Sequence, residues 1–257
     1  MKPNTWWRLA GLLALLAVVG TAAAVTILMR GQAAPLGLSH NHVSTPAPSA
    51  NPYDPLALAC RRPAVPGNSN PGITGLWVTQ PGSIAGYQAH EKFADISSPH
   101  VAVARTNTLG GWILVSAGAG GVRIETGCVA VDVRTLRSVD QLLGFNTADR
   151  DSIQRDMLGS SAHPFVIFQP YPAALNLDPT STAVQHVQVD GDVQVNGVTR
   201  MATFRLDVRL DSGQLSAAGT TTVQVGDFGV QVPTEAGGFV QVDPNVTLEV
   251  SLVLLKP

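Results

Sequence analysis

The chain has 257 residues, of which only 13% are charged, and its formal net charge is −2. Without a basic surplus or an acidic block, the sequence predicts no nucleic-acid partner and no disordered acidic tail. Valine, threonine and leucine are frequent, aromatic residues are sparse at 5%, and 25 glycines with 18 prolines mark many turns. This composition suits pleated surfaces joined by tight turns.

Residues 9–29 form an apolar segment that contains no charge and no proline. At a rise of 1.5 Å per residue, a helix of this length spans about 30 Å, the thickness of a bilayer core. Lys2 and Arg8 precede it, so the positive-inside rule places residues 1–8 in the cytoplasm. We therefore predict a single-pass signal anchor in a bacterial cytoplasmic membrane, with the remainder extracytoplasmic. The small residues at 22–24 keep a cleaved signal peptide as the alternative.

Residues 30–72 are rich in proline and serine and show no apolar periodicity, which predicts a disordered linker. His40 and His42 lie in this segment without the further ligands that a zinc site needs, and we predict no metal. Cys60 and Cys128 are the two cysteines of the chain. In an exported domain such a pair is typical of a disulfide, whereas in a cytosolic protein two inert thiols are the ordinary interpretation.

Residues 73–257 alternate apolar and polar side chains almost throughout, as in the stretch 204–210. This period of two predicts antiparallel strands with one face in a core and the other in water. Asn196-Gly197 is a strong hairpin signal, and one stretch, 149–159, has helical spacing. The candidate strands lie near 74–80, 84–90, 101–107, 111–117, 122–134, 165–171, 184–195, 198–210, 215–225 and 246–255. Long strands joined by hairpins favour an all-β, closed antiparallel barrel over a sandwich.

An ordered set of short motifs resembles the YceI-like family. The set includes Gly75-Leu76-Trp77-Val78-Thr79, Gly86-Tyr87-Gln88-Ala89-His90-Glu91-Lys92-Phe93, Arg150-Asp151 with Arg155 and Leu158, Pro164 with Phe168, and Asp227-Phe228-Gly229-Val230. The resemblance implies a lipocalin-like, extracytoplasmic barrel that binds isoprenoid and other long-chain lipids. His163 stands where the family usually has tyrosine, and an insert covers 141–148; both departures concern the mouth of the pocket.

The resemblance, together with the inward faces of the predicted strands, indicates candidate residues of a lipid pocket. Arg150 and Arg155 are candidates for binding a phosphate or carboxylate head group; the alternative is that they pair with Asp149, Asp151 or Asp156. The candidate lining residues are Trp77, Tyr87, Phe93, Phe168, Phe204, Leu206, Val208, Phe228 and Leu252.

No sequence motif indicates catalysis, and we predict neither catalytic residues nor a cofactor other than a bound lipid. The leading hypothesis is a non-catalytic, membrane-tethered protein that holds or carries isoprenoid-type lipids. An envelope interaction module with a filled barrel is the first alternative, and an unrecognised hydrolase is the second. Edge pairing of two barrels would give a homodimer.

Overall fold

The structure is a computed structural model that describes residues 33–39, 43, 54–64, 72–93, 100–141, 146–232 and 240–257. The segments predicted as cytoplasmic (1–8) and membrane-spanning (9–29) lie outside the described residues. Within the described ranges, no helix has the length and apolar character needed to span a membrane.

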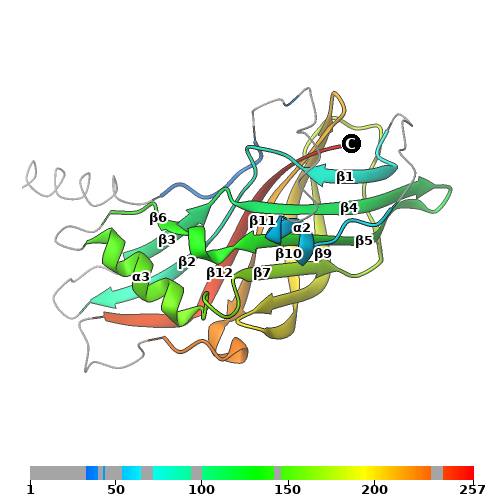
Figure 1. Ribbon diagram of the computed structural model, residues 1–257. Helices are drawn as coiled ribbons and strands as arrows, with labels where there is room; N and C mark the ends of the chain where they lie inside the picture. The colour runs from blue at the N-terminus through cyan, green and yellow to red at the C-terminus, as the bar shows by residue number, and fades with distance from the viewer. Residues whose placement is uncertain are drawn as a thin grey trace, which may run out of the picture.

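Twelve strands among the described residues form one antiparallel sheet, and eight of them close into a barrel (Figure 1). The ring runs β1–β4–β5–β7–β9–β10–β11–β12, and β12 pairs with β1 to close it. The strands are β1 (Gly75–Thr79), β2 (Ile84–Phe93), β3 (His100–Thr106), β4 (Leu109–Gly118), β5 (Gly121–Asp132), β6 (Arg137–Ser138), β7 (Phe165–Pro170), β8 (Ala173–Leu175), β9 (Gln185–Val195), β10 (Val198–Asp211), β11 (Gln214–Gln224) and β12 (Val240–Leu255). The all-β, antiparallel barrel predicted from the alternation is confirmed.

The barrel is extended on one side by β2, β3 and β6. β12 is long enough to pair with β1 near its C-terminal end and with β2 over most of its length. β3 then pairs with β2, and β6 with β3. A helix, α3 (Thr147–Met157), contacts β6 and lies beside this extension (Figure 1). Two 3-10 turns, η1 (Val133–Thr135) and η2 (Val225–Phe228), complete the same end.

The predicted elements differ from the observed ones mainly at their ends. The helix predicted at 149–159 begins two residues earlier, because Asn146 caps it by accepting from the Ala148 amide at 3.0 Å. β12 begins at Val240 rather than near 246, and its pairing with β2 shifts register between Val242 and Val246. β6 and β8 were not predicted, since strands of two and three residues are too short to show alternation.

Inside the barrel, apolar side chains form two clusters. One cluster fills the end where β1 meets β12, and we call this the closed end; Trp77 and Leu254 are almost fully buried there. The other cluster surrounds Phe228 and extends toward α3. Phe168 packs against both clusters, at the boundary between them.

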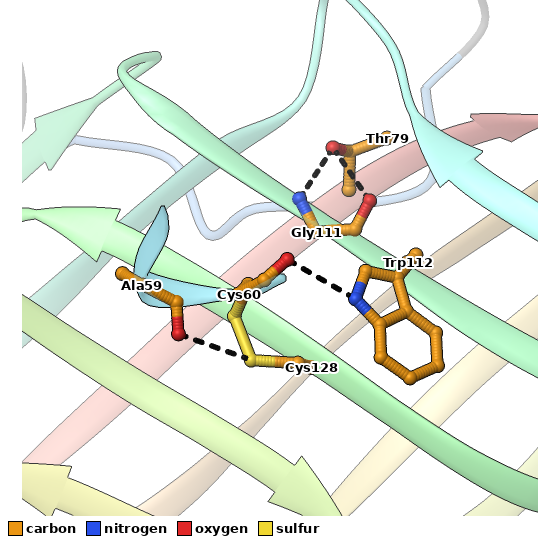
Figure 2. The surroundings of a disulfide bond; sticks show 6 residues. All are labelled: Ala59, Cys60, Thr79, Gly111, Trp112 and Cys128. Carbon is orange, nitrogen blue, oxygen red and sulfur yellow. Dashed lines mark hydrogen bonds between the residues drawn. A yellow bond between two sulfur atoms is a disulfide. The ribbon is translucent and has the colours of Figure 1, made fainter. Parts of the chain in front are cut away.

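The outer wall of β1, β4, β5 and β7 carries a second apolar surface, which the short helix α2 (Pro55–Ala59) contacts. Cys60 follows this helix and forms a disulfide with Cys128 of β5, with Cα atoms 5.4 Å apart (Figure 2). The indole of Trp112 donates to the Cys60 carbonyl at 3.2 Å beside the disulfide (Figure 2). The predicted disulfide is confirmed, and it indicates an oxidising, extracytoplasmic compartment.

Residues 33–39 and 43, which we call the N-terminal strap, also lie against the barrel. Leu36 donates its amide to Glu249 at 3.4 Å, Gly37 accepts from Ser251 at 2.8 Å, and Val43 donates to Gln214 at 2.8 Å. The expectation of an unstructured linker over 30–72 therefore does not hold at the described residues of the strap and of 54–64. Ordering these residues costs conformational entropy, and their composition predicted that this cost would not be met. Hydrogen bonds between the strap and polar side chains of the outer wall, and the disulfide at Cys60, offset it.

Candidate functional site

The barrel interior contains a cavity of about 690 Å³ between the closed end and α3. This volume lies within the range of small-molecule pockets. The wall is mainly valine, leucine, alanine and phenylalanine from the inward faces of β2, β5, β7, β9, β10, β11 and β12. Asp149 and Ile153 of α3 and its N-cap residue Asn146 also line it and are exposed, so the cavity reaches the surface beside α3. Among the described residues, the interior of the barrel is therefore not completely filled by side chains.

Most of the lining residues predicted from the sequence do border the cavity, and they are Tyr87, Phe93, Phe168, Phe204, Leu206, Phe228 and Leu252. Two others, Trp77 and Val208, face inward but belong to the packed core of the closed end. The Trp77 indole donates to the Ile73 carbonyl at 2.6 Å within that core. Alternation identifies the face on which a side chain lies, but it carries no information on depth along the barrel.

Arg150 lines the cavity, but a carboxylate already pairs with its guanidinium. Its Nη2 donates to Asp140 at 2.6 Å, and its Nε donates to Ser138 at 3.0 Å. The sequence-based alternative, in which Arg150 pairs with an aspartate of the helix, was therefore wrong about the partner. The observed partner, Asp140, precedes the helix. Asp151 instead accepts from the amide and hydroxyl of Ser138.

Arg155 is partly exposed and is not among the cavity-lining residues. Five positions separate it from Arg150, which places the two side chains about 140° apart around an α-helix. The structure therefore does not bring the two arginines together as one head-group site.

Asp140 is the centre of a buried polar cluster. Its carboxylate accepts from Arg150 and from the Val103 amide at 2.8 Å, and it lies 2.7 Å from His100 Nε2. Burial alone would raise the pKa of this carboxyl, but hydrogen bonds from His100, Arg150 and the Val103 amide lower it to about 2. No local pattern predicted this role, because the partners come from β3 and α3, which are distant from each other in the chain.

Acidification should weaken the fold through Asp140. Because its folded pKa lies below that of the unfolded chain, its contribution is complete above about pH 4 and is lost as the pH falls through about 2. The expected loss is about 2 kcal/mol. Urea unfolding of the native protein and of Asp140→Asn at pH 5 and at pH 2 checks this. The difference in free energy of unfolding between the two proteins should be about 2 kcal/mol smaller at pH 2 than at pH 5. An unchanged difference would contradict the assignment.

Two further polar residues on the cavity wall were not predicted. Glu91 lies on the inward face of β2, and burial raises the pKa of its carboxyl. Gln154 of α3 accepts from the Tyr87 hydroxyl at 2.6 Å. A signal for Glu91 was present in the sequence, since it shares the alternating face of Tyr87, Ala89 and Phe93, where a carboxylate interrupts an apolar series.

Within the part of the chain that the structure describes, no group of three or more histidine, cysteine, aspartate or glutamate side chains is arranged to hold a metal ion. The site is therefore an apolar cavity with a polar cluster between β2, β3 and α3. Such a composition suits an apolar ligand with one polar end.

Comparison with known proteins gives the family. Solved structures similar to this chain include BcnA of Burkholderia cenocepacia, with 14% identity, a TM-score of 0.44, and coverage of 66% of this chain and 95% of that one. The YceI protein of Campylobacter jejuni has 10% identity and a TM-score of 0.36, with coverage of 63% and 83%. No curated protein matches the chain. The YceI-like domain model matches residues 98–254, more than half of the chain, and the protein therefore belongs to the YceI-like family.

Proposed function

We propose that this protein holds and carries a long-chain, isoprenoid-type lipid in the barrel cavity and catalyses no reaction. The observation that carries the proposal is the apolar cavity of about 690 Å³ that reaches the surface beside α3. Membership in a family known for binding such lipids supports it. Arg150, a charged residue of the cavity wall, is hydrogen-bonded to Asp140, which supports a positioning role for this arginine in place of a catalytic one.

The energetics of the cavity favour exchange of lipid with a membrane. Each methylene of a ligand gains about 0.8 kcal/mol on leaving water for an apolar wall. A lipid that leaves a bilayer is already in hydrocarbon, so this gain largely cancels. The barrel should therefore hold its ligand with a weak net preference, as a carrier or store.

The N-terminal strap would keep the cavity close to the membrane if residues 9–29 form the anchor. The strap follows β12 from Glu249 to Ser251 and then reaches Gln214, which pairs with Leu255 at the closed end. The strap therefore begins at the cavity end of the barrel and runs toward the closed end. Four residues from position 29 to position 33 extend at most about 14 Å, so we propose that the mouth lies near the bilayer surface.

Filling the cavity should weaken lipid binding. Ala89 is buried on the inward face of β2 and lines the cavity. Ala89→Trp should reduce the affinity for geranylgeraniol at least tenfold, because the indole occupies the volume that the chain of the lipid needs. Ala89→Leu should give a smaller loss. The measurement is equilibrium binding of labelled geranylgeraniol to the full chain in lipid nanodiscs, corrected with empty nanodiscs.

The matched control is Ala174→Trp, since Ala174 lies in β8 with an exposed side chain. This variant should bind as the native protein does, and thermal unfolding should show that all three variants are folded. If folded Ala89→Trp bound the lipid with native affinity, or if the native protein bound none, the proposed function would be wrong.

A further inference from the structure

Two buried polar atoms at the cavity lack a hydrogen-bond partner among the described residues. They are Oε2 of Glu91 and Nε2 of Gln154, and both residues line the cavity. Buried polar groups in folded proteins are nearly always paired, so two such atoms that line one cavity point to groups that a ligand satisfies. A third such atom, Arg209 Nε, belongs to a residue that does not line the cavity and whose Nη2 contacts the N-terminal strap.

Both residues belong to the same polar stretch between β2 and α3. Gln154 is one helical turn after Arg150, so the two side chains share a face of α3. Its amide oxygen already accepts from Tyr87, which leaves Nε2 as the donor for a ligand. Glu91 lies on the same inward face of β2 as Tyr87. The positive charge of Arg150 interacts electrostatically with the side chains of Glu91 and Tyr87.

The charges around this stretch do not suit an anionic ligand. Arg150 is the cation of α3 that lines the cavity, and Asp140 pairs with it at 2.6 Å. Asp140 already neutralises the charge of this cation, and a phosphate or carboxylate bound to the remaining N–H groups of Arg150 would lie near Glu91. If Glu91 is ionised, its charge repels an anion; if it is protonated, it offers a single hydrogen bond and no positive charge. Separating a largely buried pair is also unfavourable.

We propose that the cavity selects lipids whose polar end is uncharged, an alcohol, aldehyde or ketone oxygen, and that Glu91 and Gln154 are the hydrogen-bonding partners of that end. The inference rests on the proposed function and narrows its ligand class. It replaces the sequence-based expectation of a phosphate or carboxylate bound by Arg150 and Arg155. In this arrangement Arg150 and Asp140 position the wall of the pocket, and Gln154 donates to the ligand oxygen.

The test compares ligands that share one chain and differ in the polar end. Farnesol, farnesal, farnesoic acid, farnesyl phosphate and the hydrocarbon farnesene are each titrated against the full chain in lipid nanodiscs, with empty nanodiscs as the reference. Farnesol and farnesal should bind at least tenfold more tightly than farnesoate and farnesyl phosphate. Equal or tighter binding of either anion would overturn the proposal.

Variants assign the selectivity to the two residues. Gln154→Leu should weaken farnesol binding about tenfold, the usual cost of leaving a buried polar group unpaired, and should leave farnesene binding unchanged. Glu91→Gln introduces an uncharged amide that can still hydrogen-bond, so this variant should retain farnesol binding. Glu91→Ala removes the polar group and should weaken farnesol binding. Gln188→Leu, at an exposed position of β9, is the matched control.

The outcomes separate this inference from the function on which it rests. Failure of every probe, farnesene included, would overturn the lipid-carrier function itself. Binding of all five probes with equal affinity would leave the carrier function standing and would overturn the selection by Glu91 and Gln154. Loss of farnesene binding in Gln154→Leu would show that the residue only shapes the cavity, which also contradicts the proposal.

Discussion

Replacing Cys60 and Cys128 together by alanine should lower the free energy of unfolding by about 4 kcal/mol. The disulfide links positions that are 68 residues apart, so it removes a large loop entropy from the unfolded chain. In the folded state it also holds α2 on the outer apolar surface, where Trp112 and Ala130 are buried. Urea unfolding of the full chain, followed by circular dichroism, measures the loss.

The reduced native protein is the control for the cysteine variant. A reducing agent should shift the unfolding midpoint of the native protein to that of the alanine variant and should not affect the variant itself. If the variant and the oxidised native protein unfolded at the same urea concentration, the disulfide would contribute no stability, and α2 would be held by its apolar contacts alone.

Replacing Asp140 by alanine should lower the free energy of unfolding by about 3–5 kcal/mol. The substitution removes the partner of Arg150, whose side chain is 21% exposed, and leaves the buried Val103 amide without an acceptor. His100, whose side chain is 11% exposed, loses its carboxylate at the same time. Because Ser138 and Asp151 link α3 to β6 beside this cluster, the damage should be concentrated at the cavity mouth.

An exposed pair of the same residue types provides the comparison for Asp140. Asp207 lies 2.6 Å from His186, but these side chains are 53% and 81% exposed. Asp207→Ala should therefore cost less than about 1 kcal/mol, as expected for surface ion pairs. Thermal or urea unfolding of both variants gives the two values. Equal costs for the two substitutions would contradict the central role of Asp140.

Several features of the protein could be predicted because they depend on neighbouring positions in the chain. Period-two alternation located the long strands and the face that each side chain occupies, as for Phe204 and Leu206 in β10. The helix was predicted within two residues at each end, since acidic residues in its first turn and a following glycine are local signals. The cysteine pair followed from counting, given an exported domain.

Whether an inward-facing side chain fills the closed end or lines the cavity depended on contacts between segments that are distant in the chain. Trp77 and Phe204 both face inward, yet Trp77 fills the closed end and Phe204 lines the cavity. Which of these occurs depends on the stagger of the strands around the barrel, a relation between distant segments that no local pattern contains.

Local patterns in the chain were therefore enough to predict the long strands, their inward faces, the helix and the cysteine pair. The position of the cavity, the pairing of Asp140 with Arg150 and the contacts of the N-terminal strap with the outer wall became known from the fold alone. Periodicity and capping act over a few residues, whereas these features depend on contacts between distant segments: β12 pairs with β1 and β2, and the extension of β2, β3 and β6 brings Asp140 to β3 and α3. The polar stretch of Glu91 and Gln154 exists only because α3 lies against β2, where Tyr87 donates to Gln154.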